Sequence, residues 1–218
     1  MILLLFGPPG CGKGTQAATL ASRFQIPAIS TGEVFRAAVK AGTELGKAAS
    51  EIMARGGLVG DDIVNGIVAD RISQPDCANG FLLDGYPRTV PQASAFGEVL
   101  RERGLPEPIV VHMQVADEVL VGRLTARRQC PKCLRIYNLQ FQPPRVAEQC
   151  DDDQTPLLTR EDDQEAVIRR RLAAYQEQTG PILQWYGASL VHTVDGARTP
   201  AQVGQAIEQA VREALQAK

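Results

Sequence analysis

A glycine-rich segment near the start of the chain, GPPGCGKGT at residues 7–15, has the residues needed to bind phosphate. It lies between an apolar run and a helix-like stretch, so backbone N–H groups and the positive end of a helix dipole would converge on an anion there. Lys13 would add a full charge at the terminal phosphates, as in the pattern G-x-x-x-x-G-K-[ST]. Gly14, however, stands where that pattern has a magnesium-binding hydroxyl. The segment predicts a nucleotide phosphate site without that hydroxyl.

Three of the five cysteines form a pattern typical of metal ligands. Cys130 and Cys133 have C-x2-C spacing, Cys150 follows, and Asp153 occupies the fourth place of a second C-x2-C. Thiolates and a carboxylate can hold Zn²⁺ in a closed tetrahedral site. The neighbouring carboxylates at 151–152 compete for the fourth position. A redox-active CPKC motif and reduced, metal-free cysteines are the alternatives.

Composition restricts the class of protein. The 218 residues are 44% hydrophobic and 22% charged, which suits an ordinary globular protein with one large domain or a domain with insertions. A net charge of −2 argues against a general nucleic-acid or membrane-surface binder. The apolar start MILLLF is short and lacks a basic leader, so we interpret it as a buried strand rather than a signal peptide. We expect a cytoplasmic location.

Short apolar runs alternate with amphipathic stretches along the chain. Such near-continuous runs favour strands of a covered parallel sheet, and the alternation predicts an α/β fold. Asp117 is expected to cap one helix, and Thr199 with Pro200 to start the last one. His112 and His192 lie in strand-like runs and are interpreted as packed or edge residues. The expected strands cover residues 2–6, 27–30, 80–85, 108–115 and 189–194.

Two segments interrupt the alternation. Residues 31–59 hold two helical patterns without a strand, and residues 126–163 hold the cysteine cluster and a Pro-Pro pair. Both are interpreted as insertions on the α/β core. The predicted division is a core of 1–29, 60–125 and 164–218, an inserted segment of 30–59, and a second one of 126–163.

The phosphate-loop segment resembles that of the adenylate kinase family, where Gly-Lys-Gly-Thr is the usual ending and magnesium is held largely by phosphates and water. Further similarity covers nearly the whole chain: STGEVFR (30–36), GFLLDGYPRTVPQ (80–92), TREDD (159–163) and VDGAR (194–198). Glu33, where the family often has Asp, and Gly60, where it more often has a larger residue, depart from the pattern. Ser30 and Glu33 also have capping-box spacing.

The resemblance implies a five-stranded parallel P-loop sheet with a helical monophosphate-binding insertion and a lid. It implies the reaction Mg-ATP + AMP ⇌ 2 ADP, with Mg²⁺ ordered by Asp84 and with Lys13, Arg88, Arg123, Arg160 and Arg171 around the transferred group. Arg123 and Arg127, four residues apart, are expected to share a helix face. The implied ATP contacts are Gly10, Cys11, Gly12, Lys13, Gly14, Thr15, Arg123, Arg127, Ile136, Tyr137 and Arg198. The implied AMP contacts are Thr31, Arg36, Gly57, Leu58, Val59, Gly85, Arg88, Gln92, Arg160 and Arg171.

Family members with long lids include zinc-bearing ones with three cysteines and one aspartate. The resemblance therefore implies one structural Zn²⁺ per chain at Cys130, Cys133, Cys150 and Asp153. Cys11 is given no catalytic role, although a thiol at a helix start beside a lysine is expected to react with thiol reagents.

Other functions stay open at this point. One is a nucleotide switch, against which stand Gly14 and the lack of an N-K-x-D motif. Another is a zinc-ribbon nucleic-acid module, which the acidic composition disfavours. Within the kinases the alternative is a UMP/CMP-type enzyme, although Thr31, Gln92 and the long lid favour AMP. The expected partners are ATP, AMP and ADP, with no nucleic acid and no membrane, and the expected state is a monomer.

Overall fold

A five-stranded parallel sheet forms the centre of the protein. The computed structural model describes residues 1–55 and 57–217, and the sheet order is β2-β3-β1-β4-β7. Every pair of neighbouring strands is parallel, which confirms the predicted α/β fold. The last strand begins two residues later than its apolar pattern. The strands are β1 (Ile2–Phe6), β2 (Ala28–Ser30), β3 (Phe81–Asp84), β4 (Ile109–Gln114) and β7 (Val191–Asp195).

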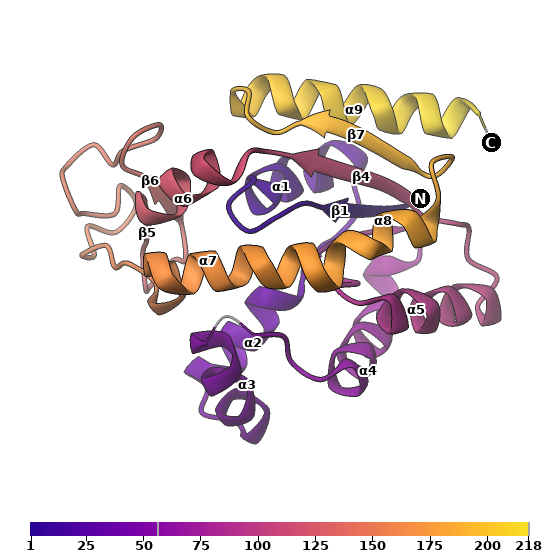
Figure 1. The fold of residues 1–218 in the computed structure, drawn as a ribbon, viewed down its shortest axis with the longest axis horizontal. Helices are drawn as coiled ribbons and strands as arrows, with labels where there is room; N and C mark the ends of the chain where they lie inside the picture. The colour runs from indigo at the N-terminus through magenta and orange to yellow at the C-terminus, as the bar shows by residue number, and fades with distance from the viewer. Residues whose placement is uncertain (56, 218) are drawn as a thin grey trace.

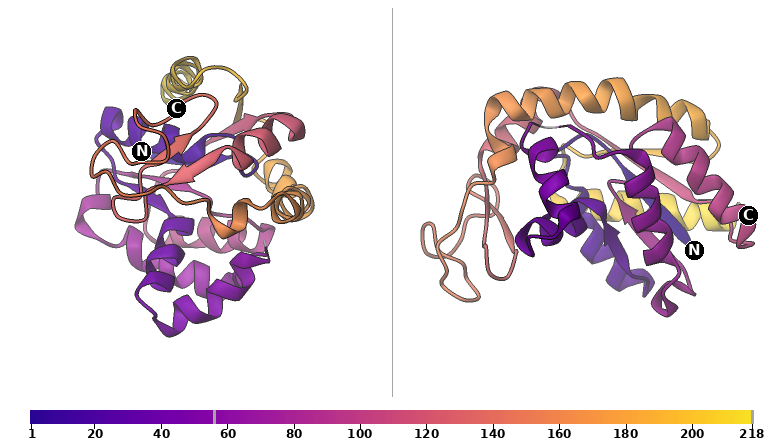
Figure 2. Two further views of the ribbon diagram at one scale, coloured as in Figure 1. Left: turned by 90° about the vertical axis from the view of Figure 1, so that its left-hand side faces the viewer. Right: turned by 90° about the horizontal axis from the view of Figure 1, so that it is seen from below.

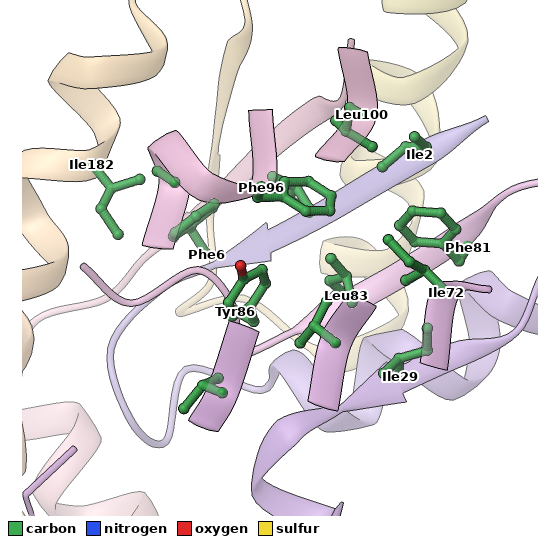
Figure 3. Packing of buried hydrophobic residues seen from close by; sticks show 14 of the residues in the cluster. Ile2, Phe6, Ile29, Ile72, Phe81, Leu83, Tyr86, Phe96, Leu100 and Ile182 are labelled. Carbon is green, nitrogen blue, oxygen red and sulfur yellow. The ribbon is translucent and has the colours of Figure 1, made fainter. Parts of the chain in front are cut away.

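Strand β1 lies in the middle of the sheet and belongs to two apolar cores. Ile2, Leu4 and Phe6 join the core that also contains Phe96, whereas Leu3 and Leu5 join the other core. Because side chains alternate across a strand, a run that is apolar throughout must be covered on both faces. Figure 3 shows the first core, in which Phe81 and Tyr86 pack edge-on against Phe96.

Helices cover both faces of the sheet (Figure 1). Buried residues of α4, α5 and α8 pack in the first core, and those of α1, α6, α7 and α9 pack in the second. The helices are α1 (Lys13–Phe24), α2 (Thr31–Lys40), α3 (Glu44–Ala54), α4 (Asp61–Ile72), α5 (Val90–Glu102), α6 (Asp117–Thr125), α7 (Glu165–Ala174), α8 (Gly180–Tyr186) and α9 (Pro200–Gln216), with short η1 (Pro75–Cys77), η2 (Glu161–Asp163) and the π-helical η3 (Tyr175–Thr179).

The capping predicted from the sequence is found at one of the three helix starts for which it was predicted. Thr199 forms a full capping box with Gln202 at the start of α9, as its pattern predicts. The prediction for α6 was wrong, because Ala116 is the N-cap and Asp117 is the first helical residue, where its charge still favours the helix dipole. Ser30 is the N-cap of α2, yet its side chain makes no capping hydrogen bond, so the expected capping box is absent.

Two small units stand beyond the carboxyl ends of the strands. One is the helix pair α2 and α3, and the other is the antiparallel hairpin of β5 (Arg127–Gln129) and β6 (Ile136–Asn138) with its long loops. The loops of this hairpin project away from the rest of the molecule (Figure 2). The two units also contact each other, because Lys40 Nζ donates to the carbonyl oxygen of Pro131 at 3.2 Å. None of the described helices has both the length and the apolar character needed to cross a bilayer.

Candidate functional site

A cavity of about 770 Å³ opens at the carboxyl edge of the sheet. This is the edge at which parallel α/β sheets place their ligands. The sheet and α1 form its floor, residues of the α2 region form one wall, and residues of the β5–β6 hairpin form the opposite wall. All residues to which the family resemblance gave nucleotide contacts line this one cavity: Gly10, Cys11, Gly12, Lys13, Gly14, Thr15, Thr31, Arg36, Gly57, Leu58, Val59, Asp84, Gly85, Arg88, Gln92, Arg123, Arg127, Ile136, Tyr137, Arg160, Arg171 and Arg198.

The phosphate-loop segment connects β1 directly to α1. Gly12 precedes α1 with φ of 103°, a left-handed conformation that residues with a Cβ rarely adopt. Gly10 has φ of 85°, and a Cβ on it would lie 2.8 Å from Leu124 Cγ. The loop is therefore held tightly against α6, with the N-terminus of α1 open to the cavity.

Lys13 folds over this loop. Its ammonium donates to the carbonyl oxygens of Gly7 at 2.6 Å and Pro8 at 3.1 Å, and it lies 3.7 Å from the sulfur of Cys11. Cys11 itself is only 1% exposed and belongs to the second core. Its thiol is therefore a packed group behind the loop, and this burial argues against the reactivity expected from sequence.

Asp84 ends β3 beside the start of α1. A Cβ on Gly14 would lie 3.8 Å from Asp84 Oδ2, so the carboxylate is close to the place where other phosphate loops carry their hydroxyl. Carboxylates are good partners for Mg²⁺ and for the water molecules around it. An acidic side chain on the neighbouring strand thus lies close to position 14, where this chain lacks the hydroxyl.

Arg88 reaches the cavity from the segment after β3. Its Nε donates to Gly85 O at 2.7 Å, and Thr31 Oγ1 donates to the same oxygen at 2.9 Å. Thr179 holds the other side by donating to Arg88 O at 2.9 Å. Burial lowers the pKa of the Arg88 guanidinium, while Asp84 acts in the opposite direction. An arginine still stays protonated at neutral pH, so a fixed, half-buried cation faces the cavity.

Gln92 is a buried amide with defined partners. It is 1% exposed, its Oε1 accepts from the backbone N–H of Arg88 at 2.7 Å, and its Nε2 donates to Asp61 Oδ1 at 2.7 Å. Sequence reasoning missed Asp61, which looks like an ordinary acid in the first turn of a helix. Only the packing of α4 against the start of α5 brings it to Gln92.

Arg127 and Arg171 share a buried carboxylate. Arg127 binds both oxygens of Asp163, whose side chain is 0% exposed, and Arg171 Nη1 lies 3.5 Å from the same group. The prediction that Arg123 and Arg127 share a helix face was wrong, since α6 ends at Thr125 and Arg127 is the first residue of β5. Both arginines nevertheless line the cavity.

The cavity holds an excess of positive charge. Burial lowers the pKa of Arg160 and of Arg171, and their charged neighbours contribute, because Arg127 lowers both values. Arg36 and Arg88 show the same direction, again mainly through burial. Cations that lower one another's pKa in a poorly hydrated cleft are stabilised in their charged form when a polyanion binds between them.

The end of the cavity away from Arg88 is made by α6, β6 and the loop after β7. Arg123 donates to the carbonyl oxygens of Gly196 at 2.8 Å and Ala197 at 3.2 Å, which ties α6 to that loop. Arg198 lines the cavity, although its side chain pairs with Asp195 on the surface. Phe141 also lines this end and is 68% exposed. Sequence reasoning missed Phe141, whose only signal is an aromatic ring in an exposed run of a small unit.

The cysteine cluster closes the far end of the hairpin. Cys133 Sγ and Cys150 Sγ are 3.5 Å apart, and Cys130 Sγ lies 3.6 Å from both oxygens of Asp153. One ligand atom from each of these four residues lies within 4.8 Å of the others. All three cysteines are free thiols. The neighbouring acids turn elsewhere: Asp152 pairs with Arg135, and Asp151 accepts from the backbone of Arg145.

Comparisons with known proteins agree with this geometry. The model of the family described as "Adenylate kinase" matches residues 5–191. The curated adenylate kinase of Trichlorobacter lovleyi is 48% identical over 98% of this chain and 100% of its own length. Those of Symbiobacterium thermophilum and Methanococcoides burtonii are 49% and 47% identical, over 97% and 90% of this chain and 99% and 91% of their own lengths. A cavity at the carboxyl edge of the sheet that is lined by these cationic residues, and a match to these relatives over nearly the whole chain, lead to one conclusion: the chain belongs to the adenylate kinase family.

Proposed function

We propose that the protein transfers a phosphoryl group reversibly from Mg-ATP to AMP, giving two ADP. The observation that carries this proposal is the shared cavity at the carboxyl edge of the sheet, which is lined both by Lys13 with the phosphate loop and by Arg88 with Gln92. One shared cavity with two cationic ends suits two nucleotides that meet at their phosphates. Such an arrangement gives the in-line positioning that phosphoryl transfer requires.

Each group has a role in the proposed reaction. The phosphate loop and Lys13 would hold the ATP phosphates, and Asp84 would order Mg²⁺, which would offset the charge of the phosphates when bound. Arg88 holds the AMP phosphate, assisted by Arg36. The remaining arginines, Arg123, Arg160 and Arg171, surround the transferred group with Arg127 beside them. No general base is assigned, because charge stabilisation and positioning supply most of the catalysis in this class of reaction.

The two small units are proposed to close over the substrates. We assign residues 30–59 to an AMP-binding insertion and 126–163 to a lid, with 1–29, 60–125 and 164–218 as the core. Both units line the cavity, and the lid contributes Arg127 and Arg160 to its lining. Closure would exclude water and so limit hydrolysis of ATP.

A coupled ADP-formation assay tests the function. ATP is combined with AMP, UMP, CMP or GMP, and turnover with AMP far above the others is the expected result. Lys13→Ala and Arg88→Ala should each lower kcat/KM by several orders of magnitude while the protein stays folded, because several kcal/mol of charge stabilisation is lost. Normal kinetics in either variant would contradict the phosphate-binding roles of these two residues. Preferred turnover of UMP or CMP would identify a pyrimidine monophosphate kinase instead.

We also propose that the four-residue cluster binds one structural Zn²⁺. Thiolate sulfurs at about 2.3 Å from a tetrahedral zinc lie roughly 3.8 Å apart, close to the spacing of Cys133 and Cys150. Tyr137 supports the cluster from outside, donating from its hydroxyl to Cys150 Sγ at 3.5 Å. Four protein ligands leave no open position for a substrate, so the ion would hold the lid together rather than take part in the reaction.

Elemental analysis and melting experiments test the proposed zinc site. One zinc per chain is expected, with a lower melting temperature after chelation and substantial activity left at low temperature. Cys130→Ala should lose the metal more completely than Asp153→Ala, because water can replace a carboxylate ligand more easily than a buried thiolate. A purified protein with three reduced thiols and no metal would rule out the zinc site and leave the kinase proposal intact.

The proposed active unit is a monomer, because one chain supplies both ends of the cavity. Sedimentation at several protein concentrations tests this, with a single species of about 23.5 kDa expected. Activity that depends on protein concentration beyond simple proportionality would contradict it.

A further inference from the structure

Asp61 faces the buried amide of Gln92 from a different helix. It is the first residue of α4, whereas Gln92 is in the first turn of α5. Asp61 Oδ1 accepts from Gln92 Nε2 at 2.7 Å, and Asp61 Oδ2 accepts from Thr89 Oγ1 at 2.9 Å. Both carboxylate oxygens are thus directed at the start of α5, and a charged acceptor makes these hydrogen bonds stronger than neutral ones.

These partners allow only one orientation of the amide. A carboxylate only accepts hydrogen bonds, so Asp61 must face the NH₂ group of Gln92. The backbone N–H of Arg88 only donates, so it must face the oxygen of the same amide, 2.7 Å away. Turning the amide over would set an oxygen against a carboxylate and a nitrogen against an N–H. Two independent contacts therefore determine which side of Gln92 is donor and which is acceptor.

The neighbouring packing keeps Asp61 in place. Tyr86 is 3% exposed, and its hydroxyl donates to Asn65 Oδ1 on α4 at 2.7 Å. The same hydroxyl lies 3.3 Å from the carbonyl oxygen of Gln92. Tyr86 thus links α4, which carries Asp61, to the backbone at the start of α5.

The orientation of the amide matters for the base that it meets. One N–H and one oxygen lone pair of Gln92 remain for a ligand, and the residue lines the cavity. Adenine offers a ring-nitrogen acceptor beside an amino donor, which pairs with this arrangement. A 6-oxopurine offers an N–H donor beside a carbonyl acceptor and would oppose it at both positions. A site with buried polar groups rejects a base that leaves them unpaired.

We propose that Asp61 is a specificity-determining positioning residue that locks the Gln92 amide in the orientation that accepts adenine and opposes 6-oxopurines. This rests on the proposed AMP site, in which Gln92 meets the base. Asp61 itself does not touch the reacting phosphates. Its effect is therefore expected in the KM for the monophosphate and in the choice of base, and not in kcat.

The test compares AMP with IMP, which has the same ring outline but the reversed donor and acceptor. Kinetics at saturating Mg-ATP are measured for the wild type, Asp61→Ala, Asp61→Asn and the control Asp62→Ala. Asp62 is exposed and lies in the same first turn of α4, so its loss removes the same charge from the helix N-terminus without touching Gln92. Thermal melting shows which variants are folded.

Asp61→Ala should raise the KM for AMP about tenfold, leave kcat within about twofold, and lower the AMP-over-IMP ratio of kcat/KM about tenfold, as loss of one charge-assisted hydrogen bond implies. Asp61→Asn keeps the shape of the side chain and should lower the ratio less, because its amide can also accept. Asp62→Ala should match the wild type. An unchanged ratio in both folded Asp61 variants, or in Asp61→Asn alone if the alanine variant does not fold, overturns the proposal. A wild type without AMP turnover would instead overturn the proposed function.

Discussion

Replacing Asp163 should reveal how strongly a buried carboxylate holds the base of the proposed lid. Its side chain is 0% exposed, it binds both Nε and Nη2 of Arg127, and Arg171 approaches it as a third donor. Asp163→Asn keeps the size of the side chain but removes the charge. Arg127, whose side chain is 16% exposed, would then stay largely buried without its counter-charge.

The magnitude follows from that burial. Removing one partner of a buried ion pair costs about 3–5 kcal/mol, because the other charge remains desolvated. The partial exposure of Arg127 and its access to the open cavity place the expected loss near the lower limit, about 3 kcal/mol. For a chain of this size, about 3 kcal/mol corresponds to a fall of roughly 6–12 °C in the melting temperature.

Urea unfolding followed by circular dichroism measures the loss, and Glu165→Gln is the matched control. Glu165 pairs with Arg169 on α7, but both side chains are more than half exposed, at 57% and 66%. An exposed pair of this kind contributes about 0–0.5 kcal/mol. Equal effects of Asp163→Asn and Glu165→Gln would refute the reasoning, since burial would then make no difference to the value of the pair.

Three further predictions concern buried or half-buried groups. Tyr186→Phe should raise the free energy of unfolding by about 1 kcal/mol, because the Tyr186 hydroxyl is buried without a hydrogen-bond partner in the described part of the chain; a clear loss on urea unfolding would show that it has one. Burial and nearby Lys13 lower the pKa of His112, so the unfolded state binds this proton more tightly than the folded state. The contribution of His112 to the free energy of unfolding should therefore be complete above pH 6.5 and be lost as the pH falls below it. Melting curves should show a smaller fall of stability with pH in His112→Gln, and equal falls in the variant and the wild type would count against the idea. Cys11 should react slowly with thiol reagents until the protein unfolds, and rapid inactivation that is absent in Cys11→Ser would contradict its burial.

The strands and the phosphate loop were predictable because their signals are local. An apolar run such as residues 2–6 must be covered on both faces. A glycine-rich turn followed by Lys13 at the start of a helix is typical of a phosphate-binding loop. The same holds for Thr199 and Gln202, which lie three residues apart and meet within one turn.

The rest of the site depends on contacts between distant segments. Asp61 meets Gln92 only because α4 packs beside α5, and nothing at position 61 indicates it. The end of α6 was missed for a similar reason: residues 122–128 contain no helix breaker after the glycine, and pairing of Arg127–Gln129 with β6 ends the helix instead. Tertiary hydrogen bonds override weak local propensity in such places.

The contacts of Lys13 have a consequence for how an anion would enter the loop. The ammonium already donates to the carbonyl oxygens of Gly7 and Pro8, so these oxygens take the place of part of its hydration shell. An arriving phosphate would exchange one set of oxygen acceptors for another, and little bulk water would have to be removed at that moment. The barrier to capture would then come from turning one flexible side chain, a motion of picoseconds to nanoseconds, and not from reshaping a loop that glycine and Leu124 hold in place.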